Sequence, residues 1–121
     1  MTKHRVPQKG DVYIINPNPQ AGREMRNPHR FIVISPKEIN KLGTAITVPV
    51  TSGGNYSRLK GLTVSISGYD TTGVAVCNQV RSFDIEERVR IGTAKYIENL
   101  GGHIIDEIVL KVISVIDPAQ P

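Results

Sequence analysis

The stretch Thr44-Ala-Ile-Thr-Val-Pro-Val-Thr51 runs directly into Ser52-Gly-Gly-Asn55. The β-branched residues of the first segment favour an extended strand, and the Ser-Gly-Gly-Asn run favours a turn or loop. The sequence therefore predicts a strand that ends at position 51, with more strands to be sought on either side of it.

Other short β-rich runs flank this strand and are separated by Gly, Pro and Asn. They span Asp11–Asn16, Phe31–Ser35, Leu62–Ser67 and Gly73–Val80, with Val89–Thr93 as a weaker candidate. Their spacing leaves no room for crossover helices, so we expect an antiparallel sheet of five or six strands, curled into a small barrel or half-barrel. Residues 37–42 are expected to form one helical turn.

Residues 103–116 follow a helical period instead. Apolar residues recur at 104/105, 108/109, 112/113 and 116, and residues 107, 111 and 114 are polar. Acidic residues in the first turn and a proline just past the last turn also favour a helix. We expect residues 1–121 to form one mainly β domain, whose amphipathic helix packs on the sheet or lends area to a dimer.

Positive charge is concentrated in the first half of the chain. Residues 1–60 hold 10 Lys and Arg against 3 Asp and Glu, whereas residues 61–121 hold 5 against 8, for a net charge of +4. This asymmetry favours a polyanionic partner such as nucleic acid, although ordinary scatter in a small protein gives the same result.

The sequence excludes several classes of protein and site. The single cysteine, Cys77, can form neither an internal disulfide nor a cysteine-based zinc site, and the histidines are far apart in sequence. Walker, dinucleotide-binding and serine-hydrolase motifs do not occur. We therefore expect no metal and no other cofactor. No apolar run approaches the roughly 20 residues that span a membrane, and there is no signal-peptide pattern, so we expect a cytoplasmic protein.

The first candidate site is the polar segment from Gly22 to Arg30, between the first two predicted strands. When a ribose hydroxyl attacks its neighbouring phosphodiester, the reaction needs a proton acceptor, a proton donor and positive charge on the pentacoordinate phosphorane. Glu24, His29 and Arg30 supply these three types of group. The alternative is a solvated charged loop without chemistry.

The second candidate site is the segment from Thr51 to Lys60. It offers hydroxyls, backbone amides, an aromatic ring and two cations, which suit single-stranded nucleic acid. Tyr56 can stack on a base, and Arg58 and Lys60 can follow the phosphates. The alternative is a Gly-rich hairpin loop.

The third candidate site is the end of the predicted strand from Gly73. Alternation puts Asn78 on one face and Gln79 with Arg81 on the other. Either set can read bases, and the alternative is that these side chains complete hydrogen bonds at a strand end.

In this order, the segments resemble the MazF/PemK/Kid family of toxin endoribonucleases from bacterial toxin–antitoxin pairs, with the closest likeness to the ChpB and Kid type. The likeness covers about residues 9–116. It rests on Gly10-Asp11, Pro19, Gly22–Met25 with Arg30-Phe31, Val48–Asn55 and Gly73–Arg81.

The resemblance implies an SH3-like (MazF/CcdB-like) antiparallel barrel with a C-terminal helix, a homodimer, and ribosome-independent cutting of single-stranded RNA at short sequences. It also implies neutralisation by a cognate acidic antitoxin. By position, Arg30 matches the catalytic arginine, Thr51 and Ser52 the hydroxyls beside the scissile phosphate, and Glu24 the loop acid. The other expected substrate-binding residues are Arg23, Asn55, Tyr56, Arg58, Asn78, Gln79 and Arg81.

Three positions depart from the Kid pattern, which has histidine at Arg23, arginine at Val76 and aspartate at Asn78. Asn78 cannot act as a carboxylate base, so the base is expected to be Glu24 or His29. ChpB-like members also have Asn-Gln-Val-Arg here, so the departure is compatible with activity.

The expected reaction is metal-independent transesterification, in which the 2′-hydroxyl attacks phosphorus and leaves a 2′,3′-cyclic phosphate and a 5′-hydroxyl end. Two alternatives stay open. One is a CcdB-like toxin that poisons gyrase without cutting RNA, and the other is an RNA-binding barrel without catalysis.

Overall fold

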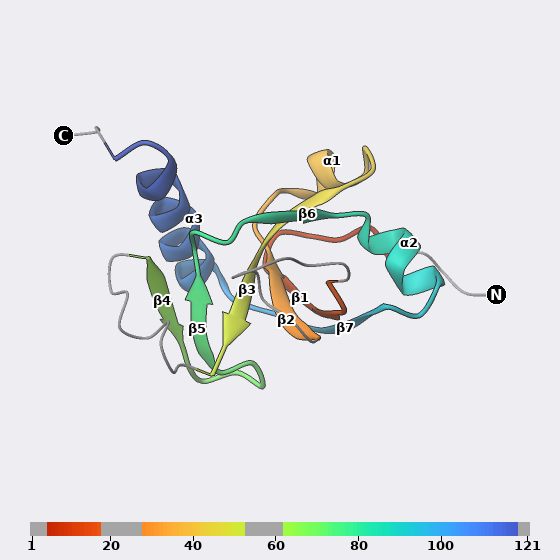
Figure 1. The fold of residues 1–121 in the computed structure, drawn as a ribbon, viewed down its shortest axis with the longest axis horizontal. Helices are drawn as coiled ribbons and strands as arrows, with labels where there is room; N and C mark the ends of the chain where they lie inside the picture. Colours follow the sequence, from red (N-terminus) through yellow and green to blue (C-terminus); the bar gives the residue numbers. More distant parts are fainter. Residues whose placement is uncertain (1–4, 18–27, 53–61, 119–121) are drawn as a thin grey trace.

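The computed structural model describes residues 5–17, 28–52 and 62–118 of the chain (Figure 1). These ranges hold seven strands and three helices. The strands are β1 (Asp11–Ile15), β2 (His29–Val33), β3 (Ala45–Thr51), β4 (Thr63–Ile66), β5 (Gly73–Val76), β6 (Arg81–Phe83) and β7 (Ala94–Asn99). The helices are α1 (Lys37–Asn40), α2 (Ile85–Arg90) and α3 (Gly102–Ile116).

All strands join one antiparallel sheet in the order β4-β5-β3-β2-β1-β7. The strand β3 is central: β2 pairs along one side, and on the other side β6 pairs with Ala45–Thr47 and β5 with Val50 and Thr51. In the described ranges this path does not close on itself. The mainly β, antiparallel fold that the sequence predicts is confirmed, and a closed barrel is not formed within these ranges.

Apolar residues fill both faces of the sheet because successive side chains in a strand point to opposite faces. On one face, Val12, Ile32 and Val48 are neighbours across three strands and pack with Ile108 of α3. On the other face, the cluster contains Tyr13, Ile15, Phe31, Val33, Ala45, Phe83, Ile85 and Ala94. The sheet is therefore covered from both sides. In Figure 1, α3 and α2 lie at opposite ends of it.

The helix expected over 103–116 is confirmed as α3, which buries Ile105, Ile108 and Val112. This helix packs on its own sheet, next to β4. The helical turn expected at 37–42 is confirmed as α1. No helix in the described part of the chain is both long and apolar enough to cross a bilayer.

The strand expected at Val89–Thr93 is wrong. The helix α2 runs to Arg90, and β7 begins only at Ala94. The helix is capped by Asp84, whose carboxylate accepts a 3.1 Å hydrogen bond from the Glu87 amide, as N-cap residues commonly do. Gly92, with φ of +85°, then reverses the chain between α2 and β7.

The run expected as one strand over Gly73–Val80 is divided. The strand β5 ends at Val76, a turn follows, and the Gln79 amide donates to the Val76 carbonyl at 3.2 Å. The strand β6 then starts at Arg81. The division lets one segment pair with both ends of β3, so the alternation predicted through residue 80 does not hold.

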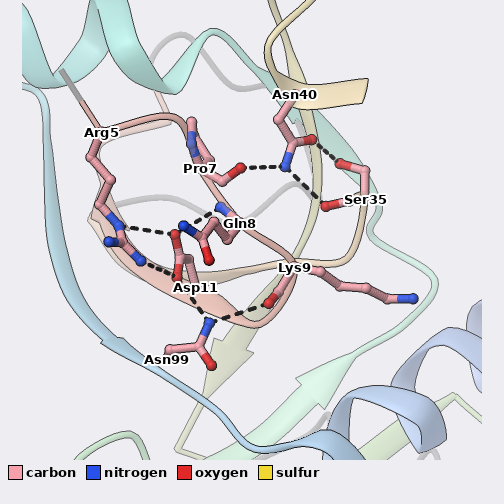
Figure 2. Close-up of polar contacts among 8 residues, drawn as sticks. All are labelled: Arg5, Pro7, Gln8, Lys9, Asp11, Ser35, Asn40 and Asn99. Atoms are coloured by element: carbon pink, nitrogen blue, oxygen red, sulfur yellow. Dashed lines mark hydrogen bonds and ion pairs between the residues drawn. The ribbon is translucent and has the colours of Figure 1, made fainter. Parts of the chain in front are cut away.

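A buried polar network secures the start of the chain (Figure 2). Asp11 is fully buried and accepts hydrogen bonds from Arg5 Nη2 at 2.8 Å, the Gln8 amide at 2.8 Å and Asn99 Nδ2 at 2.9 Å. Beside it, Gly10 has φ of +93°, and a Cβ there would lie 2.9 Å from the Leu100 carbonyl oxygen. This network joins the N-terminal segment to the end of β7 and belongs to the scaffold.

Candidate active site

Six of the predicted site residues lie outside the described ranges: Arg23, Glu24, Asn55, Tyr56, Arg58 and Lys60. The others lie in β2, at the end of β3, in the turn between β5 and β6, and at the start of β6. The geometry of the site is therefore built from these and from what they contact.

Two predicted catalytic residues, Arg30 and Thr51, lie at the same end of the sheet. The strands β2 and β3 are antiparallel, and Arg30 pairs with Val50, so Thr51 is the next residue of the neighbouring strand. His29 is the first residue of β2 and is half-buried. Ser52 follows β3 and is exposed. These four residues therefore lie at one end of the sheet, with Arg30 on the face of Val50 and with His29 and Thr51 on the opposite face by strand alternation.

The guanidinium of Arg30 is held by two residues from distant parts of the chain. Its Nη1 donates a 2.8 Å hydrogen bond to Thr71 Oγ1, and the same nitrogen lies 3.9 Å from Glu98 Oε2. The Thr71 amide donates to that Glu98 oxygen at 2.6 Å. Thr71 is fully buried, and the Arg30 side chain is 33% exposed. The cation is thus anchored on the protein side and accessible from solvent.

Sequence reasoning missed both Thr71 and Glu98. Glu98 lies in β7, a strand that the hydrophobic pattern does not reveal, and it faces Val12 of β1 across the sheet. Recognising that strand would have placed the carboxylate two strands from Arg30. Thr71 lies between β4 and β5, and nothing in the pattern marks it.

The connection that carries Thr71 also presses against the end of β3. Gly73 has φ of +130°, and a Cβ at this position would lie only 2.1 Å from the Thr51 carbonyl oxygen. Only glycine allows the two backbones to approach so closely. The segment 71–73 therefore touches Arg30 at one end and Thr51 at the other; in Figure 1 it lies where β3 ends and β5 begins.

Arg81 lies apart from this cluster. It pairs with Thr47, which is four residues or about 13 Å from Thr51 along β3. Its guanidinium lies 4.9 Å from the centre of the Phe83 ring and donates to the Pro17 carbonyl at 3.4 Å. Arg81 thus braces the chain just before residue 18, beyond which Arg23 and Glu24 follow in sequence.

Arg88 lies against the same ring, with its guanidinium 4.8 Å from the centre of Phe83, and donates to the Asn16 carbonyl at 2.7 Å.

Asn78 is exposed in the turn between β5 and β6, and Gln79 is half-buried there. Their role in RNA binding stays a prediction.

The buried thiol of Cys77 is a poor nucleophile. Burial raises the pKa of this thiol to about 11, so it stays protonated near neutral pH. Within the described ranges, no three His, Cys, Asp or Glu side chains gather as a metal site would require.

This arrangement suits a phosphate group. A guanidinium recognises phosphate oxygens through charge-assisted hydrogen bonds, and nearby hydroxyls add donors. A charge that is already fixed in place can stabilise a transition state without reorganising. The site can therefore bind a phosphodiester and stabilise extra charge on it.

Comparison with known proteins gives a consistent result. Residues 8–116 match the family model described as a PemK-like, MazF-like toxin of type II toxin–antitoxin system. The chain is similar to the endoribonuclease toxin ChpB of Escherichia coli K12, with 30% identity over 120 residues, 97% of this chain and all of ChpB. It is equally similar to the endoribonuclease PemK of Escherichia coli, with 30% identity over 112 residues, 90% of this chain and 81% of PemK.

A solved structure is also similar. The crystal structure of MazF from Deinococcus radiodurans superposes with a TM-score of 0.77 at 26% identity, covering 93% of this chain and 97% of that one. The similarity therefore extends over nearly the whole chain in both sequence and fold.

Proposed function

Because the chain belongs to the PemK-like, MazF-like family of toxins from type II toxin–antitoxin systems, we propose that it is an endoribonuclease that cleaves single-stranded RNA and thereby arrests translation and growth. The family resemblance drawn from the sequence is confirmed. The relatives PemK and ChpB are both named endoribonucleases, which supports the proposed reaction class.

The reaction is a metal-independent transesterification. The 2′-oxygen of a ribose attacks the adjacent phosphorus and loses its proton to a base, while the bond from phosphorus to the 5′-oxygen breaks and that oxygen gains a proton. The products are a 2′,3′-cyclic phosphate and a 5′-hydroxyl end. DNA lacks the nucleophile and is spared.

The observation that carries this proposal is the anchored, accessible guanidinium of Arg30 at the end of the sheet where β3 ends in Thr51. Arg30 stabilises the added negative charge of the phosphorane, and Thr51 with Ser52 donates to phosphate oxygens. Arginine stays protonated at any physiological pH, so it is a poor base. The base is His29, next to Arg30 in β2, or Glu24.

The remaining parts of the proposal follow the family. A cognate antitoxin with an acidic segment occupies the site around Arg30 and competes with RNA, since its carboxylates resemble phosphates in charge. The toxin acts in the cytoplasm as a homodimer. Arg23, Asn55, Tyr56 and Arg58 stay predicted RNA contacts.

The test is incubation of purified protein with a long single-stranded RNA in excess EDTA, followed by sequencing of the 5′ ends. We expect cuts at one short sequence. Arg30→Ala should abolish them, whereas Arg90→Ala, which removes the same charge from exposed α2, should leave them unchanged. Intact RNA with wild type, or equal cutting by Arg30→Ala, would reject the proposal; salt-sensitive binding of uncut RNA would instead identify a binding protein.

A further inference from the structure

Glu98 brings a negative charge into the Arg30 cluster from the edge strand β7. Its side chain is only 17% exposed, and its Oε2 both accepts the 2.6 Å hydrogen bond from the Thr71 amide and lies 3.9 Å from Arg30 Nη1. Burying a carboxylate is costly unless its charge and its lone pairs are matched. Here the guanidinium matches the charge and the amide matches a lone pair.

Thr71 transmits the position of Glu98 to Arg30. Its amide is held by the carboxylate, and its Oγ1 accepts the 2.8 Å hydrogen bond from Arg30 Nη1. Arg30 Nη1 is therefore held by Glu98 itself and by Thr71, whose amide is in turn held by Glu98. A free arginine side chain samples many rotamers, so this anchoring fixes the charge in place before RNA arrives.

The same connection also contacts the backbone of Thr51. Two residues after Thr71, Gly73 packs directly on the Thr51 carbonyl. Because Glu98 holds residue 71, it fixes one end of a three-residue segment whose other end contacts the hydroxyl residue. The carboxylate thus holds the Arg30 guanidinium, and the segment that it anchors also contacts the backbone of Thr51.

We infer that Glu98 is a positioning residue of the ribonuclease, acting through Thr71 and Arg30 rather than on the RNA. The inference rests on the proposed function, since it concerns the step in which Arg30 stabilises the phosphorane. Glu98 also lowers the net positive charge that RNA meets here. Its removal should therefore weaken transition-state stabilisation and leave RNA binding equal or tighter.

The test is Glu98→Gln, which keeps the shape and an acceptor for the Thr71 amide but removes the charge. The matched control is Glu38→Gln, which removes an exposed charge from α1. With a short RNA that contains the mapped cleavage sequence, we expect kcat of Glu98→Gln to fall about tenfold or more at an unchanged or lower KM, and Glu38→Gln to match wild type.

A second variant tests the hydrogen bond between Arg30 and Thr71. Thr71→Val removes the Oγ1 acceptor but keeps the shape and the amide, so kcat should fall here too, again without a rise in KM. An unchanged kcat in Glu98→Gln, or a rise in KM alone, would overturn the inference about Glu98. RNA cutting by the wild-type protein in the same experiment would still support the proposed function.

A measurement without RNA tests the positioning role of Glu98 separately from the proposed ribonuclease activity. Nitrogen-15 relaxation of the Arg30 Nε–Hε group reports the order of the guanidinium directly. We expect a lower order parameter in Glu98→Gln than in wild type and in Glu38→Gln. If wild type cuts no RNA, the proposed function fails, and an unchanged order parameter would then also reject the positioning role of Glu98.

Discussion

Replacing Gly73 with alanine tests the contact that ties the segment 71–73 to Thr51. A Cβ at Gly73 would lie 2.1 Å from the Thr51 carbonyl oxygen and 3.0 Å from its carbonyl carbon, whereas ordinary contact begins at 3.4 Å. The two backbones would have to separate by roughly 1.3 Å. Because Thr51 is proposed to contact the phosphate, this change should disturb stability and catalysis together.

The magnitude follows from two separate costs. A non-glycine residue at a positive φ costs about 1–3 kcal/mol, and forcing extra atoms into a packed site costs about 1–3 kcal/mol more. Gly43→Ala is a matched control, because Gly43 has φ of +140° but no atom within 4 Å of the added Cβ. It carries only the first cost, so the difference between the two variants isolates the second.

The assay is urea unfolding of both variants at one protein concentration, together with kcat on the mapped RNA. Gly73→Ala should be about 1–3 kcal/mol less stable than Gly43→Ala, which corresponds to a midpoint lower by about 1 M. It should also lose activity that Gly43→Ala retains. Equal stability of the two variants with wild-type cutting by Gly73→Ala would refute the close-contact argument.

Three further predictions concern the scaffold. Asp11→Ala should lower the free energy of unfolding by about 2–4 kcal/mol because it leaves buried donors unpaired, whereas exposed Asp106→Ala should change it by under about 0.5 kcal/mol in the same urea titration. Arg88→Ala should lower it by about 1–3 kcal/mol, through loss of a backbone hydrogen bond and of the stacking on Phe83; an unchanged thermal midpoint would contradict this. Burial raises the pKa of Cys77 from 9.0 to about 11, so the unfolded chain loses this proton first and stability should fall between pH 9 and 11, less steeply in Cys77→Ala; equal slopes would contradict the shift.

The sequence predicts those strands whose own residues are rich in β-branched side chains and are followed by sharp turns. β1 to β5 lie where such runs occur, and the periodic stretch at the end of the chain forms α3. β7 was missed because the successive residues Lys95 and Tyr96 are both exposed and break the alternating pattern, so its strand character comes from pairing with β1. Long-range pairing of this kind leaves little trace in local composition.

The site residues likewise fall into those that the sequence predicts and those that only the fold brings together. The motifs pointed to Arg30 and Thr51, and the register of β2 and β3 brings these residues to one end of the sheet. Thr71 and Glu98 reach Arg30 only through the fold, over separations of 41 and 68 residues in the chain. No motif could show that a carboxylate from the last strand would anchor an arginine of the second.

The central claim is that a 2′-hydroxyl of the RNA attacks phosphorus beside Arg30. The most direct measurement uses two short RNAs in EDTA that differ only in the ribose 5′ to the cleaved bond, one with a 2′-hydroxyl and one with 2′-deoxyribose. Mass spectrometry should find a 2′,3′-cyclic phosphate and a 5′-hydroxyl end from the first RNA and no cleavage of the second. Cleavage of the deoxy-substituted strand at the same bond would contradict the account.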